Sequence, residues 1–245
     1  WSITDVARIG FAMQKSDRPS PAGLENVLEA AVCRRLVSDV PVGAFLSGGI
    51  DSSIVTALMA RNSPGRISTF SIGFEDPALD ESKYANAVAA HLGTDHTSCI
   101  VSDSDMLAVI PKLPWMYDEP FADSSQIPTY LVSRLAHSKV KVALSGDGGD
   151  ELFGGYQRYR EAVKVWNTLR HLPYQMRRLT ASAITQLAPM IAVGDARLGL
   201  SRRTSNRFVR AALRAPVSVS EVLRSRAFED VYRGMVSAWT TPPLL

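Results

Sequence analysis

Two glycine-rich segments of this chain carry side chains that could bind a nucleotide. Residues 46–53 read LSGGIDSS, and residues 144–156 read LSGDGGDELFGGY. In the first segment, Gly48 and Gly49 allow a sharp turn and a close approach to a ligand, and Ser52 and Ser53 are expected to open a helix. The free N–H groups and the dipole at a helix N-terminus favour an anion. The first segment therefore predicts a phosphate-binding loop.

This loop differs from two widespread phosphate loops. No lysine follows its glycines as in GxxxxGK[ST], and the spacing is not the GxGxxG of dinucleotide-binding folds. The alternative is a strand-to-helix turn that binds nothing. The presence of Ser47, Asp51 and Ser52 around the glycines favours phosphate binding over that alternative.

The second segment concentrates negative charge. Asp147, Asp150 and Glu151 stand among five glycines, so that their carboxylates would repel one another. Exposure to solvent is one explanation of how this repulsion is tolerated. A Mg²⁺–ATP complex is the other, because the metal reverses the sign of the local field.

The spacing of apolar residues predicts the elements that hold these segments. It indicates strands at 42–46, 67–74, 97–101 and 140–144, and helices around 21–32, 54–59, 84–92 and 127–135. Ser20 is the expected N-cap of the first helix, and Gly93 is the expected end of the third. Strands that alternate with helices predict an α/β fold, with a parallel sheet, right-handed crossovers and helices on both faces. Such sheets bind ligands beyond the carboxyl ends of their strands, where both glycine-rich segments fall.

Charge divides the chain into two parts. Residues 158–226 contain fourteen basic and three acidic residues, whereas the rest contains more acids than bases. We therefore expect an α/β core over 1–157 and a mainly helical, basic C-terminal portion over 158–245. A basic helix can contact nucleic acid or a membrane surface, but the arginines of 207–214 alternate with apolar residues. This alternation favours a solvated helix face, and we expect neither a nucleic-acid nor a membrane partner.

Composition excludes several classes of protein. The chain has 245 residues, 46% hydrophobic and 21% charged, with a mean hydropathy near zero, as in a globular protein. It has no run of about 18 apolar residues that could cross a membrane and no secretory signal, so we expect a cytoplasmic location. Two cysteines, Cys33 and Cys99, without a CxxC pair exclude a disulfide framework and a structural zinc site, and we expect reduced thiols in the core. The start at Trp1 and the end at PPLL suggest a piece of a longer protein.

Three motifs together carry a family resemblance. The segment SGGIDSS, residues 117–125 (YDEPFADSS) and residues 145–156 (SGDGGDELFGGY) occur in this order. They resemble the synthetase domain of glutamine-hydrolysing asparagine synthetases, within the ATP-pyrophosphatase (PP-loop) superfamily with its adenine nucleotide alpha hydrolase-like fold. The resemblance spans about 24–159 and is weak beyond. It implies that ATP and Mg²⁺ are used, that a carboxylate attacks the α-phosphorus to form an acyl-adenylate and pyrophosphate, and that ammonia then displaces AMP.

The resemblance also implies roles for individual residues. Asp51 and Asp150 would hold Mg²⁺. Asp147 would be catalytic and would meet the ammonia or the acyl substrate, in a place where the family more often has the longer glutamate. The residues implied to bind the nucleotide are Ser47, Gly48, Gly49, Asp51, Ser52 and Ser53 at the phosphates, Ile72 at adenine with Phe45 and Leu46 nearby, and Ser145 and Gly146 along the nucleotide.

Three departures from the family limit what is implied. Neither Cys33 nor Cys99 is placed as the N-terminal nucleophile of a glutaminase, so we expect that domain elsewhere in the full-length protein as the source of ammonia. Some aspartate users carry Thr-Thr-x-Arg where residues 120–123 read PFAD, which leaves aspartate or a related acid open as the carboxylate substrate. The family also places a lysine late in the domain, and no lysine follows Lys164 here.

Two alternatives stay open, together with the oligomeric state, for which we consider a homodimer. A tRNA-thiolating or lysidine-forming enzyme would use the same loop and could use the basic portion to hold RNA phosphates, but the second and third motifs do not fit it. A non-catalytic nucleotide-binding or docking module is the other alternative, which the missing lysine and glutaminase half keep open.

Overall fold

The computed structural model describes residues 20–119, 123–198 and 216–236, together with Ser2, Asp5, Arg8 and Ile9. Its internal contacts divide the chain into two units, Trp1–Gly149 and Asp150–Leu245. The division expected after residue 157 stays a prediction. Residues 120–122 of the middle motif, the arginine-rich stretch 207–214 and the closing PPLL lie outside the described residues.

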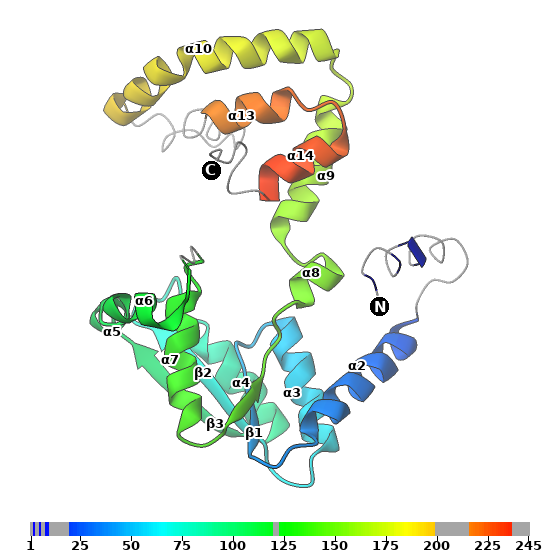
Figure 1. Cartoon of the computed structure of the whole chain (residues 1–245), viewed down its shortest axis with the longest axis vertical. Coiled ribbons are helices and arrows are strands. Elements are labelled where there is room, and N and C mark those ends of the chain that lie inside the picture. Colours follow the sequence, from blue (N-terminus) through cyan, green and yellow to red (C-terminus); the bar gives the residue numbers. More distant parts are fainter. Residues whose placement is uncertain are drawn as a thin grey trace. The chain divides into compact units, whose positions relative to one another are not determined.

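The first unit is built on a four-stranded parallel sheet with the order β3-β2-β1-β4. Figure 1 shows this sheet with the helices of the same unit around it. The strands are β1 (Val42–Phe45), β2 (Ser68–Phe74), β3 (Asp95–Val101) and β4 (Val142–Leu144). In the central strand, Ala44 pairs with Thr69 of β2 on one side and with Leu144 of β4 on the other. The carboxyl ends of β1 and β4 therefore lie side by side, and one glycine-rich segment begins at each.

The predicted helices are confirmed, although their ends differ. They are α2 (Pro21–Leu36), α3 (Ile50–Asn62), α4 (Ser82–Leu92) and α7 (Gln126–His137). The Ser20 hydroxyl caps α2 by accepting the N–H of Gly23 at 3.0 Å, and Gly93, with φ +67°, ends α4 in the left-handed conformation. Four short helices were not expected: α5 (Asp103–Leu107), η1 (Ile110–Lys112), α6 (Leu113–Met116) and α8 (Gly149–Phe153).

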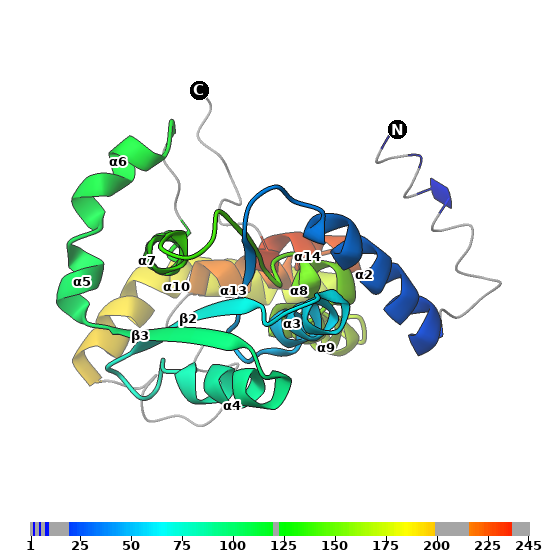
Figure 2. The same ribbon diagram turned by 90° about the horizontal axis from the view of Figure 1, so that it is seen from below.

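Helices cover both faces of the sheet because side chains alternate along each strand. On one face, the fully buried Phe70 packs with the half-buried Phe45 and with Ala136 of α7. Ala44, on the other face, packs with Leu58 and Met59 of α3. Figure 2 shows α7 on one side of the strands and α4 on the other.

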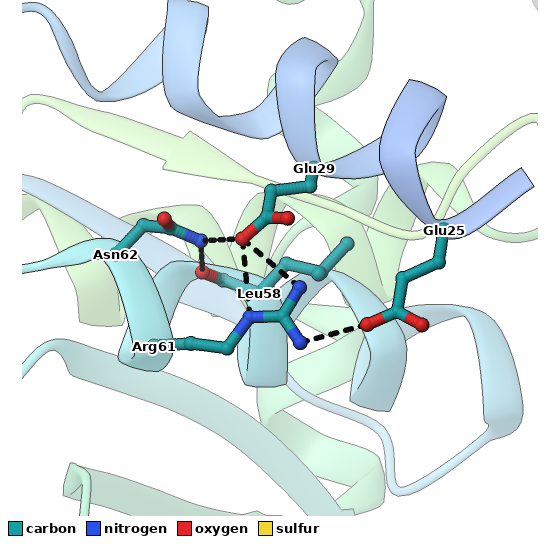
Figure 3. A network of polar contacts seen from close by, with 5 residues as sticks. All are labelled: Glu25, Glu29, Leu58, Arg61 and Asn62. Carbon is teal, nitrogen blue, oxygen red and sulfur yellow. Dashed lines mark hydrogen bonds and ion pairs between the residues drawn. The ribbon is translucent and has the colours of Figure 1, made fainter. Parts of the chain in front are cut away.

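A polar network joins α2 to α3 at the surface (Figure 3). Arg61 of α3 reaches Glu25 at 2.7 Å and Glu29 at 2.9 Å, both on α2. The amide of Asn62 donates to the same Glu29 carboxylate at 2.9 Å. Hydrogen bonds from Asn62 and Arg61 lower the pKa of Glu29 below its ordinary value. The network therefore fixes how α2 lies along α3.

The expectation of two core thiols is wrong. Cys33 is half-buried in α2, and Cys99 is exposed on β3. The reason is topological, since β3 is an outer strand of the sheet and its side chains are less covered. Tyr84, expected on the apolar face of its helix, is likewise 55% exposed.

The second unit is helical over its described residues, as predicted for the C-terminal portion. It comprises α9 (Gln157–Leu169), α10 (Tyr174–Leu198), α13 (Pro216–Leu223) and α14 (Phe228–Val236). Its core contains Ala162, Leu169 and Val231. Arg177 is buried and donates hydrogen bonds to the carbonyls of Leu223 and Ser225, which fixes the end of α13. Among the helices described in either unit, none is long and apolar enough to span a membrane.

Candidate nucleotide-binding site

The first glycine-rich loop runs from the end of β1 into α3. The helix begins at Ile50 with Gly49 as its N-cap, so Ser52 and Ser53 lie within its first turn instead of opening it. This corrects the expected start by two residues. The N–H of Ser53 is already bonded to the carbonyl of Gly49 at 3.1 Å. The backbone N–H groups that a phosphate could use therefore lie earlier in the loop and helix.

Two serine side chains hold the loop in shape. The hydroxyls of Ser47 and Ser52 lie 3.0 Å apart. Ser47 also accepts the N–H of Gly49 at 3.2 Å, and Ser52 accepts the N–H of Ser47 at 3.3 Å. Ser52 is 7% exposed. The buried hydroxyl of Ser52 thus stabilises the loop through its contacts with Ser47.

Gly48 brings the loop against α4. Its φ is +80°, and a Cβ there would lie 2.6 Å from the backbone N of Ala85 and from the backbone C of Tyr84. Only glycine fits this conformation and this contact without strain. Sequence reasoning missed the first turn of α4 as a wall of the site, because this packing joins segments about 36 residues apart and local pattern does not encode it.

The second glycine-rich segment meets the first at the start of α3. A Cβ on Gly146 would lie 2.6 Å from the backbone N of Ser52. A Cβ on Gly149 would lie 2.5 Å from a carboxylate oxygen of Asp51. Two glycines of one motif therefore leave room for the first turn of the helix that carries the other motif. The motifs form one surface at the carboxyl edge of β1 and β4.

The acidic residues differ in their surroundings. Asp51 is half-buried against Gly149. Asp147 is exposed, accepts the Ser145 hydroxyl at 3.0 Å and donates its N–H to the same hydroxyl at 3.3 Å, so its carboxylate is turned onto its own loop. Asp150 belongs to the second unit, where its side chain lies against Gly155. The structure thus brings Asp51 and Asp147 to the segments that meet, and it describes Asp150 with the other unit.

The donor set suits a metal carried by phosphate more than one held by protein alone. No group of three or more His, Cys, Asp or Glu side chains among the described residues is arranged to hold a metal ion. Mg²⁺ commonly binds through one or two carboxylates, substrate phosphates and water. Asp51 beside a glycine-lined loop fits that kind of coordination.

The hydroxyl of Ser53, in the first turn of α3, is a buried polar group without a hydrogen-bond partner among the described residues. A buried hydroxyl without a partner costs about 1–3 kcal/mol. A phosphate oxygen or a bridging water at the loop would relieve this cost.

The residues expected near adenine lie at the end of β1 and in the second half of β2. Phe45 and Ile72 are half-buried on the face that α7 covers. Ile72 lines a cavity of about 300 Å³ with Cys99 and Arg134. Leu46 is 1% exposed and packs against Ala85, so its side chain is part of the core and it could offer a ligand only its backbone.

The middle motif is described only in part. Asp123 accepts the N–H of Ser125 at 2.8 Å. Hydrogen bonds from Ser125 lower the pKa of Asp123, which favours its charged form. The Asp123 carboxylate therefore closes a turn just before α7.

Comparison with known proteins supplies the family. The family described as asparagine synthase matches residues 23–244. The glutamine-hydrolyzing asparagine synthetase 1 of Bacillus subtilis is 46% identical over 128 residues, which cover 52% of this chain and 20% of the relative. The glutamine-hydrolyzing asparagine synthetase 1 of Arabidopsis thaliana is 36% identical over 156 residues, which cover 58% of this chain and 26% of the relative. An NH3-dependent NAD synthetase from Campylobacter jejuni aligns with 83% of this chain and 96% of its own, with a TM-score of 0.39 and 14% identity.

The family match extends beyond the motifs. It includes most of the second unit, whereas the sequence resemblance weakens after residue 159. The chain spans only between a fifth and a third of the length of the curated relatives that it matches. This chain belongs to the asparagine synthase family.

Proposed function

We propose that this chain carries the ATP-dependent step of an amidation. A carboxylate, aspartate or a related acid, would be activated by ATP and then amidated by ammonia. The observation that carries the proposal is the contact of Gly146 and Gly149 with the first turn of α3. It unites both glycine-rich motifs at the carboxyl edge of a parallel sheet, where such sheets bind nucleotides.

In the proposed reaction, a carboxylate oxygen attacks the α-phosphorus of ATP. The bond from that phosphorus to the β-bridging oxygen breaks, and pyrophosphate leaves with its electron pair. Backbone N–H groups of the loop, with Gly48 and Gly49 at its tip, would stabilise the charge that builds on the phosphates. Ser47 and Ser52 would keep these groups in place through their hydrogen bonds.

Ammonia would then attack the acyl carbon, and AMP would leave. The nitrogen must lose a proton to become the neutral amide. Asp147, exposed and bonded only to its own loop among the described residues, is the carboxylate proposed to meet the ammonia. To do so it would turn away from Ser145.

Mg²⁺ would be held by Asp51 and Asp150, and it would supply positive charge to the departing pyrophosphate. Support for Asp51 comes from its position against Gly149 in the loop. Ammonia would come from a glutaminase domain of the full-length protein. The family relationship and the names of the relatives, all glutamine-hydrolyzing enzymes, support this partner.

Product analysis tests the proposal. The full-length protein, incubated with Mg²⁺, ATP, ammonia and a set of carboxylates, should release AMP and pyrophosphate in equal amounts, and only when its carboxylate is present. Chromatography of the nucleotides distinguishes AMP from ADP. ADP and phosphate as the main products would place the activation at the γ-phosphorus and would overturn the proposal.

A further inference from the structure

The first turn of α4 sets the shape of the phosphate loop. Gly48 lies against the backbone of Tyr84 and Ala85 and against the Cβ of Tyr84. Ala85 is fully buried and packs with Leu46, the first residue of the loop segment. A shift of this turn would therefore move the loop, because the contact involves the backbone of both segments.

One side chain ties that turn to the sheet. The Asp80 carboxylate accepts the backbone N–H of Ser82 at 3.0 Å and the hydroxyl of Ser82 at 3.0 Å. Ser82 is the first residue of α4 and is 8% exposed. Glu81, at the N-cap position, makes no capping bond through its own side chain. Asp80 thus caps α4 in place of the N-cap residue.

The same carboxylate reaches back to the end of β2. A Cβ on Gly73 would lie 2.5 Å from an oxygen of Asp80. Hydrogen bonds from Ser82, and also one from the backbone of Phe74, lower the pKa of Asp80 and keep it charged. Asp80 therefore links the carboxyl end of β2 to the first turn of α4, and through that turn to Gly48.

We infer that Asp80 is a positioning residue for the nucleotide: it holds the start of α4 against β2, and this helix start holds the phosphate loop in its binding shape. The inference rests on the proposed function, since it assumes that the loop binds Mg²⁺–ATP. The contacts described for Asp80 are with Ser82, Gly73 and Phe74, and none of these residues belongs to the phosphate loop. Asp80 therefore acts on the loop through α4.

The test compares Asp80→Ala and Asp80→Asn with a matched control. The control is Asp76→Asn, because Asp76 lies in the same β2–α4 connection and its carboxylate accepts the N–H of Ala78 at 2.9 Å, with no hydrogen bond to α4 in the described part of the chain. Calorimetry measures the Mg²⁺–ATP affinity of the 245-residue chain, at a temperature well below the unfolding midpoint of every variant. We expect Asp80→Ala to weaken binding about three- to tenfold, as loss of a cap shifts a local equilibrium. Asp80→Asn keeps one acceptor oxygen, so its Mg²⁺–ATP affinity should lie between those of wild type and Asp80→Ala. Asp76→Asn should bind Mg²⁺–ATP as tightly as wild type.

Kinetics of the full-length protein separate positioning from general damage. Asp80→Asn should raise the KM for ATP and leave the KM for the carboxylate unchanged. A wild-type affinity in both Asp80 variants, or an equal loss in Asp76→Asn, would overturn the inference. If wild type itself binds no ATP, the proposed function fails instead. If Asp80→Ala does not fold, the Mg²⁺–ATP affinity of Asp80→Asn tests the inference.

Discussion

The glycine residues at the candidate site allow close packing of neighbouring segments because they lack a side chain. Gly48 combines a positive φ with backbone contact to α4, and Gly146 and Gly149 leave room for α3. A Cβ at any of these positions would meet backbone or the carboxylate of Asp51. The site is therefore specified as much by absent atoms as by the serines and aspartates that would touch a ligand.

Gly48→Ala should damage both stability and nucleotide binding. The new Cβ would be strained by the left-handed backbone and would push against the first turn of α4. We expect a loss of roughly 1–3 kcal/mol in the free energy of unfolding, and weaker Mg²⁺–ATP binding at temperatures where the variant is folded. Denaturant unfolding and calorimetry measure the two effects.

Gly65→Ala is the control, because a Cβ there would meet nothing within 4 Å. It should match wild type in both measurements. A Gly48→Ala protein as stable as Gly65→Ala, with unchanged affinity, would show that the loop does not press on α4.

At the scale of elements, surface contacts decide how the outer helix is held. Glu29 joins α2 to both Arg61 and Asn62 of α3. These hydrogen bonds lower the pKa of Glu29 in the folded chain relative to the unfolded chain. The linked stability is therefore present above the ordinary pKa of 4.5 and is lost as the pH falls below it, through the lowered pKa.

Glu29→Gln should flatten this part of the pH dependence. The variant should lose less stability than wild type when the pH is lowered from 5 toward 3, and the difference should be small because the group is at the surface. Thermal unfolding at a series of pH values measures it, with the exposed Asp103→Asn as control. Parallel curves for wild type and Glu29→Gln would contradict the role given to this carboxylate.

The sequence predicted elements well where local pattern was enough. Apolar runs marked the four strands, and Ser20 and Gly93 marked the ends of helices. Their alternation implied a parallel sheet, which places the carboxyl ends of all its strands along one edge, although only the observed strand order makes β1 and β4 neighbours. The common edge is why both motifs could be assigned to one site before any distance was known.

Other features could not be predicted because they depend on contacts between distant segments. The exposure of Cys99 follows from its strand lying at the edge of the sheet, which strand order alone reveals. The short helices between 103 and 116 carry too few turns to show a period. The link from Asp80 through α4 to Gly48 requires three segments to be packed first.

At the scale of the whole chain, the two units share one family match but differ in composition. The first holds one whole glycine-rich motif and residues 144–149 of the other, and the second is helical over its described residues and contains no lysine after Lys164. Arginine presents a planar fork where lysine offers a point charge, so the two are not equivalent in an adenylating site.

The metal dependence of nucleotide binding at Asp51 tests the proposed function most directly. Calorimetry should show that the wild-type chain binds ATP more tightly with Mg²⁺ than with a chelator. Asp51→Ala should lose most of this gain and keep the metal-free affinity, because a carboxylate next to phosphates is favourable only with a cation between them. The exposed Asp39→Ala should behave as wild type. Equal affinities of wild type and Asp51→Ala, with and without Mg²⁺, would contradict the proposal that this loop binds Mg²⁺–ATP through Asp51.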